Sequence, residues 1–124
     1  MKLAHFEDLT VWQKSQDLCV AVYGVSKEGL FGRDRALQDQ IRRAAISVTS
    51  NIAEGFERYS RTEFKHFLSI SRGSVSEIRS QLHLARRLNY ISETQFGELH
   101  SLCLEISRML AKLHSTLNDR SSAK

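Results

Sequence analysis

Four basic residues recur at seven-residue intervals in the second half of the chain. They are Lys65, Arg72, Arg79 and Arg86. In a helix that follows the 3.5-residue period of a helical bundle, a seven-residue repeat stays on one face. Arginine binds phosphate or carboxylate through paired, forked hydrogen bonds. The spacing therefore predicts a basic strip that suits a polyanion.

The predicted strip is almost free of acidic residues. Glu63 and Glu77 project away from it at about 100° per residue. Like charges one and two turns apart repel each other, so a polyanion, or acids from a neighbouring helix or subunit, would offset the repulsion. His83 falls on the same strip, and Arg61 and Arg87 lie near its edges. Other basic residues that could extend the patch are Arg42, Arg43 and Arg58.

Three interpretations of the strip stay open. It is a solvated or internally paired face, a nucleic-acid surface, or an interface between subunits. Nucleic acid bound there would be held mainly by its phosphates, with an affinity that falls steeply with salt. Tyr59 and Tyr90 fall near helix ends and the phenylalanines at core positions, so the sequence shows no aromatic platform for single strands and predicts no base-specific readout.

The sequence contains no recognisable catalytic or cofactor motif. A di-iron bundle needs Glu-x-x-His on two helices, and the segment 63–66 is the single instance. The five histidines lack metal-ligand spacing, and no phosphate-binding glycine loop or Gly-x-Ser-x-Gly segment occurs. We expect no enzyme activity, no cofactor and no metal. A small enzyme with an unrecognised site is the weakest alternative.

The composition is that of one ordinary globular domain. The 124 residues are 41% hydrophobic and 26% charged, with a formal net charge of +4 and no proline. The chain begins with no apolar run of the signal-peptide type, and no stretch resembles a membrane span. Cys19 and Cys103 sit at apolar positions, which predicts reduced core cysteines and a cytoplasmic location.

Apolar residues spaced three and four apart predict helices at about residues 9–25, 34–54, 61–88 and 93–117. A polar, flexible tail is expected at 118–124, and residues 1–124 form a single domain. The short turn before the last helix makes the last two helices antiparallel. We therefore predict an all-α fold, an antiparallel up-and-down four-helix bundle.

Residue types at the predicted helix ends suggest how each helix starts or stops. Ser60 and Ser92 open capping-box patterns, and Asp8 or Thr10 is expected to cap the first helix. Gly55 is expected to end the second helix. The segment that runs from the first helix through residue 32 is expected to be a loop.

Two further features concern burial. Asn51 occupies an apolar position of the second predicted helix, so its amide should be buried and hydrogen-bonded, fixing helix register or, alternatively, touching a ligand. Leu102, Leu104 and Met109 lie beyond the main apolar seam of the last helix. An exposed apolar strip is a liability for a monomer, so the bundle buries these side chains or subunits meet there. We expect an oligomer.

The segment 40–55, which reads QIRRAAISVTSNIAEG, resembles the signature of a bacterial four-helix-bundle family, the proteins encoded in intervening sequences of 23S ribosomal RNA genes. Short matches at 6–13, 63–68, 73–77 and 88–91 extend the likeness over about residues 6–117. The resemblance implies a ring-shaped homopentamer whose biochemical role is largely unassigned. It brings no catalytic residue, and Asn51, Glu54 and Gly55 carry over as structural positions.

A related branch of that family is similar to the accessory proteins of diversity-generating retroelements, which are basic pentamers that work with a reverse transcriptase and RNA. This kinship favours the polyanion interpretation of the strip. One departure is the loop before the second helix, at residues 30–34, which lacks the family's common proline. The leading hypothesis is a non-enzymatic, RNA-associated oligomer in the cytoplasm. The alternative is a protein-interaction scaffold that binds no nucleic acid.

Overall fold

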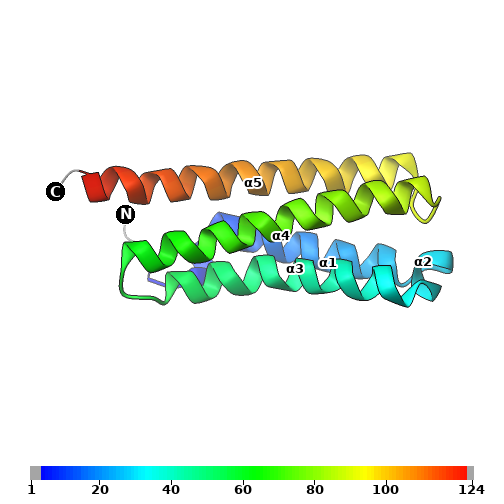
Figure 1. The fold of residues 1–124 in the computed structure, drawn as a ribbon, viewed down its shortest axis with the longest axis horizontal. Helices are drawn as coiled ribbons and strands as arrows, with labels where there is room; N and C mark the ends of the chain where they lie inside the picture. Colours follow the sequence, from blue (N-terminus) through cyan, green and yellow to red (C-terminus); the bar gives the residue numbers. More distant parts are fainter. Residues whose placement is uncertain (1–3, 123–124) are drawn as a thin grey trace.

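The computed structural model describes residues 4–122, with side chains through Leu117. A short 3-10 turn, η1 (Phe6–Asp8), precedes the helices. They are α1 (Thr10–Ser26), α2 (Gly29–Arg33), α3 (Arg35–Phe56), α4 (Arg61–Arg87) and α5 (Glu93–Ser122). The long helices α1, α3, α4 and α5 run alternately up and down beside one another (Figure 1). The predicted four-helix bundle is confirmed.

The long helices follow a closed order around the bundle. α3 packs against α1 and α4, and α5 packs against α4 and α1. The α3–α4 contact is the most extensive and the α1–α5 contact the least. α1 begins and α5 ends at one end of the bundle, while α2 and the α4–α5 turn lie at the other (Figure 1).

The core consists mainly of aliphatic side chains from all four long helices. Burying each such side chain contributes about 1.5–3 kcal/mol before the cost of chain entropy. Cys103 is buried and Cys19 half-buried, and both are free thiols. In the part of the chain that is described, no helix is long and apolar enough to cross a membrane. The largest fully buried side chains are Phe31, Leu18, Ile41, Ile52, Leu68, Ile78, Leu82, Ile106 and Leu110.

Small and hydroxylated residues allow α3 and α4 to approach closely. A Cβ atom on Gly55 would lie 2.7 Å from Phe67 Cβ and 3.0 Å from Phe64 Cδ1. Ser71 Oγ donates to the Val48 carbonyl oxygen at 2.8 Å. The prediction that Gly55 ends its helix is wrong, because α3 continues to Phe56 and this glycine makes room for α4 instead.

The expected loop between the first two long helices contains a helical turn, α2, so that part of the prediction is wrong. Phe31 in this turn is completely buried, and its ring centroid lies 5.5 Å from that of Tyr90. The Tyr90 hydroxyl donates to Asp34 Oδ2 at 2.9 Å. Burial of one aromatic ring folds the segment into a helical turn that closes the end of the bundle.

Helix ends follow the predicted capping only in part. Ser60 Oγ accepts the Glu63 N–H at 3.1 Å, and Ser92 and Gln95 form the reciprocal capping box. α1 begins after Leu9 without a side-chain cap, so neither Asp8 nor Thr10 caps it. α5 continues to Ser122, past the predicted end at 117, and no proline or glycine follows that position to stop it.

Candidate polyanion-binding surface along α4 and α5

The basic strip, defined as Lys65, Arg72, Arg79 and Arg86, runs along one side of α4. Its residues span about 31 Å at 1.5 Å rise per residue. Ser71 and Ser74 point towards α3, where their hydroxyls bond to Val48 and Ser47. The strip lies on the other side of α4, towards α5. Arg72 is exposed, and the other three side chains are partly buried.

Arg86 is held against the start of α5. Its guanidinium carbon lies 4.0 Å from the centroid of the Phe96 ring. Its Nη1 lies 3.7 Å from Glu93 Oε1, and its Nη2 lies 3.3 Å from His83 Nδ1. The Glu93 side chain is 83% exposed, so this ion pair is weak and open to solvent.

Two histidines join the strip at the same place. The ring centroids of His83 and His100 are 5.3 Å apart, and each lies within 5.0 Å of the Phe96 ring. Desolvation lowers the pKa of His100, and the nearby charges of Arg79, His83 and Arg86 lower it further. His100 is therefore largely uncharged near neutral pH.

Arg79 lies in the middle of the strip, beside α5. Its Nε atom is buried and finds no hydrogen-bond partner in the part of the chain that the structure describes. Its charge acts on Cys103, although burial dominates there and raises the pKa of the thiol to about 12. Arg79 thus brings an uncompensated charge to the boundary between α4 and α5.

Acidic side chains are largely absent from this surface. Among the described residues, Glu93 is the one carboxylate within 4.0 Å of a strip cation. Glu105 pairs with Lys14 of α1 at 3.2 Å, which directs it away from α4. Arg58 pairs with Glu54 at 2.7 Å and with Glu63 at 3.9 Å. Glu54, Glu63 and Glu105 therefore pair with cations that are not part of the strip.

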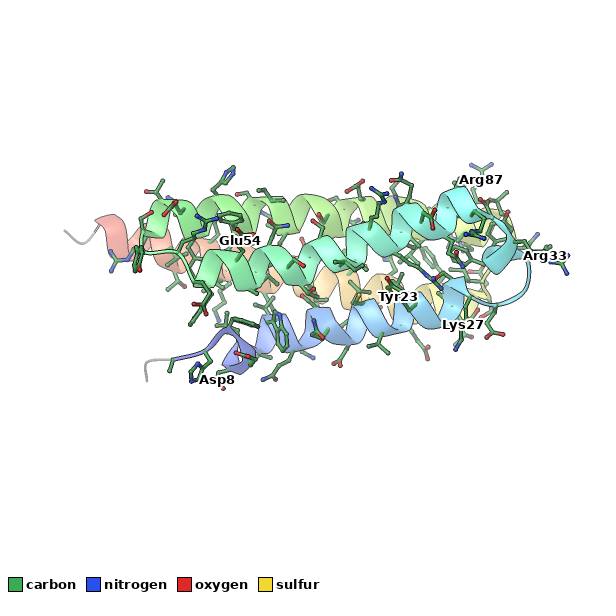
Figure 2. All side chains as sticks on the ribbon, turned by 90° about the horizontal axis from the view of Figure 1, so that it is seen from below. Asp8, Tyr23, Lys27, Arg33, Glu54 and Arg87 are labelled. Atoms are coloured by element: carbon green, nitrogen blue, oxygen red, sulfur yellow. The ribbon has the colours of Figure 1, made fainter. Side chains whose placement is uncertain are left out.

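The structure does not bring all of the other candidate residues to this surface. Arg42 lies on the other flank of α3, where it donates to Ser26 Oγ at 2.8 Å and stacks on the Tyr23 ring at 4.4 Å. Arg43 is exposed, one turn before Ser47, on the α4 side of α3. Arg87 is exposed at the end of α4, at the opposite end of the bundle from Glu54 (Figure 2).

Sequence reasoning missed the α5 half of this surface. Phe96 and His100 are one turn apart on α5 and meet the α4 cations, whereas the sequence predicts a core position for Phe96 and no role for His100. Their spacing of four residues, opposite the last turn of α4, was the available signal. Among the side chains that the structure describes, no group of three or more His, Cys, Asp or Glu residues is placed to hold a metal ion.

Comparison with known proteins identifies the family. Residues 7–112 match the sequence profile of the family described as 23S rRNA-intervening sequence protein. The chain belongs to this family. No curated protein matched the chain.

A solved structure shares the fold of this family member. It is the crystal structure of a protein of unknown function from the S23 ribosomal protein family of Bacteroides thetaiotaomicron. The two chains superpose with a TM-score of 0.74 at 24% sequence identity, over 85% of this chain and 98% of the other. The likeness supports the bundle architecture and assigns no activity.

In this chain, the segment 51–55 lies where α3 packs against α4. Asn51 is half-buried, and its Nδ2 donates to the Ser47 carbonyl at 2.8 Å and to Ser47 Oγ at 3.0 Å. Ser74 Oγ then donates to the same Ser47 Oγ at 2.8 Å. Glu54 anchors Arg58, whose guanidinium lies 4.9 Å from the Phe67 ring centroid. These contacts account for the motif structurally.

Proposed function

We propose that this protein is a non-enzymatic, RNA-associated oligomer of the cytoplasm that contacts phosphates through the basic strip. The observation that carries the proposal is the lack of acids beside the strip. Only the exposed Glu93 pairs with a strip cation among the described residues. Lys65, Arg72 and Arg79 have no acidic partner among the described residues, and an external polyanion would compensate their charges.

The geometry favours phosphate contacts over base contacts. Phe96 is buried beneath Arg86, so it offers no free face on which a base could stack. Tyr59 is fully exposed, but it lies in the α3–α4 junction and outside the strip. We therefore expect affinity that depends on salt and little on sequence.

The test is RNA binding across a salt series with a labelled, mixed-sequence RNA. The variant Arg72→Gln with Arg86→Gln removes two strip cations. The matched control, Arg33→Gln with Arg35→Gln, removes two exposed arginines near the start of α3. We expect the strip variant to bind more weakly and its salt slope to shrink by about 1 per lost phosphate contact, while the control loses far less.

The proposal fails if the wild type shows no RNA binding at low salt. It fails equally if the strip variant and the control weaken binding by the same amount, because net charge alone would then explain the effect. Helix content by circular dichroism and assembly mass by light scattering, compared across the variants, show that each remains folded and assembled.

A protein-interaction scaffold is the second candidate, favoured by the outer face of α1 and α3. Val20 is 72% exposed, Ile46 44% and Tyr23 40%. A hollow of about 460 Å³ beside them includes Cys19, Val20, Tyr23 and Arg42 in its lining, and Figure 2 shows Tyr23 between the two helices. Leu102, Leu104 and Met109, which lie on α5, are also only partly buried within one chain. We propose that such a scaffold would assemble through the outer face of α1 and α3, where a second copy of this chain would pack.

A further inference from the structure

Five side chains form a compact cluster where the end of α4 meets the start of α5. This histidine cluster consists of Arg79, His83, Arg86, Phe96 and His100. The Phe96 and His100 rings are stacked, with centroids 5.0 Å apart and an interplanar angle of 22°. The His83 ring centroid lies 4.9 Å from that of Phe96. Phe96 is the shared packing surface for the basic groups.

Two buried nitrogen atoms of the cluster, Arg79 Nε and His100 Nε2, have no hydrogen-bond partner among the described residues. An arginine side chain can only donate hydrogen bonds, so Arg86 Nη2 donates to His83 Nδ1 at 3.3 Å. That contact requires His83 to be neutral, with its proton on Nε2.

The charged and titratable groups of the described residues that face the two imidazoles come from α4 and α5. On α4 they are Arg79 and Arg86, and these act on His100 together with His83. On α5 they are Glu93, which reaches the cluster only through Arg86, and the Cys103 thiol, which stays neutral because burial raises its pKa to about 12. Of the charges on described residues, none from α1 or α3 contributes to the lowering of the His100 pKa.

We propose that the histidine cluster is a proton-gated phosphate-binding site, in which Arg79, Arg86 and the protonated His83 and His100 take one phosphate group. The inference rests on the proposed function, because the phosphate would be that of the bound RNA. A free phosphate has the same chemistry, and the experiment separates the two sources.

Protonation supplies the gate. Once His83 Nδ1 carries a proton it becomes a donor, and the hydrogen bond from Arg86 is lost. The Arg86 guanidinium is then free to reach an oxygen of a bound anion. Four cations at close range repel one another, and a bound anion offsets that repulsion. Binding and protonation therefore favour each other.

The coupling is reciprocal. A bound phosphate places negative charge beside His100 and raises its pKa from the lowered value it has in the free protein. By linkage, protonation of His100 strengthens phosphate binding by the same factor. A rise of about one pKa unit corresponds to a tenfold gain in affinity between the deprotonated and protonated forms.

The first experiment is an NMR titration of the histidine ring protons of the intact protein in chloride, in inorganic phosphate and in sulfate at matched ionic strength. Sulfate keeps its charge over this pH range, so it separates protonation of the protein from protonation of the anion. We expect phosphate and sulfate to raise the His100 pKa by about one unit. His66, which is exposed on α4 outside the cluster, should move little. Equal changes at His66 and His100, or none at either, overturn the inference.

The second experiment measures RNA affinity at pH 7.5 and pH 5.5 at constant ionic strength. The variant His83→Gln with His100→Gln is compared with His5→Gln and His66→Gln, which change two exposed histidines outside the cluster. We expect the wild type and the control to gain about tenfold at pH 5.5, and the cluster variant to gain little. Arg79→Gln, which leaves both imidazoles in place, should also abolish the anion effect on His100.

The outcomes separate the two proposals. RNA binding without pH dependence, together with no anion effect on His100, overturns the phosphate site and leaves the strip as an RNA surface. An anion effect on His100 without RNA binding supports the site, assigns it to free phosphate and rejects the proposed function.

Discussion

The guanidinium of Arg86 lies 4.0 Å from the centroid of the Phe96 ring, across the boundary between α4 and α5. A cation over an aromatic face is attracted by the ring quadrupole, by about 0.5–2 kcal/mol according to its solvation. The Arg86 side chain is 32% exposed, which places the contact between the surface and buried limits. One interaction therefore joins the two helices and sets the direction of the last strip cation.

The Arg86–Phe96 contact can be measured by a double-mutant cycle. Phe96→Leu should lower the free energy of unfolding, because it loses the cation–π contact and ring packing. Arg86→Gln removes the same contact from the other side. We expect a coupling of about 0.5–2 kcal/mol from urea unfolding of both single variants and the double variant. Strictly additive losses would show that the two side chains do not interact.

Alanine substitutions at Gly55 and Gly73 should change the stability of the protein in opposite directions. Gly55→Ala should destabilise by about 1–3 kcal/mol, because the new Cβ would lie 2.7 Å from Phe67 Cβ and the helices must shift. Gly73→Ala, on α4, meets nothing within 4 Å and should stabilise by about 0.5–1 kcal/mol through helix propensity. Thermal and urea unfolding report both signs. A neutral or stabilising Gly55→Ala would contradict the close approach of α3 and α4.

The two cysteines should differ sharply in reactivity. Cys103 is completely buried, and its pKa is raised to about 12, whereas Cys19 is half-buried with a smaller rise in pKa. A thiol reagent at pH 8 should label Cys19 first and Cys103 only as fast as the protein opens. Cys19→Ser should remove the fast phase alone. Rapid labelling of Cys103 in that variant would show that the α4–α5 core is accessible.

The raised pKa of Cys103 also predicts how stability changes in alkali. The folded pKa of about 12 lies above the ordinary value of 9.0. The contribution of the Cys103 thiol to the free energy of unfolding is therefore fully present below about pH 9 and is lost as the pH rises towards 12. Cys103→Ala should remove this part of the loss of stability in alkali. Cys19→Ser leaves Cys103 in place and should therefore keep most of that loss. Urea midpoints measured from pH 8 to pH 11 test the difference.

The apolar face of α1 and α3 should control assembly. Val20→Asp places a charge on the proposed subunit contact and should shift the protein to smaller species in sedimentation velocity, with at least about tenfold weaker association. Leu30→Asp is the matched control, because Leu30 is 60% exposed but lies on α2. Equal assembly of both variants and the wild type would reject this face as the contact.

The sequence alone determined the features that depend on residues a few positions apart. The spacing of apolar residues set four helices, and the capping boxes at Ser60 and Ser92 formed because their partners lie three residues away. The seven-residue repeat also places the basic strip on one side of α4, because a helix in a bundle keeps such a repeat on one face. The family signature was also readable from the sequence, because its main part is the continuous segment 40–55.

Only the tertiary structure decided which helices meet and what each side chain touches. It turned Arg42 towards Tyr23 of α1 and brought Phe96 and His100 of α5 beside the cations of α4. It also made Gly55 a point of helix contact instead of a helix end. Helical periodicity defines a face but does not name its neighbour, because pairing depends on the packing of the whole core.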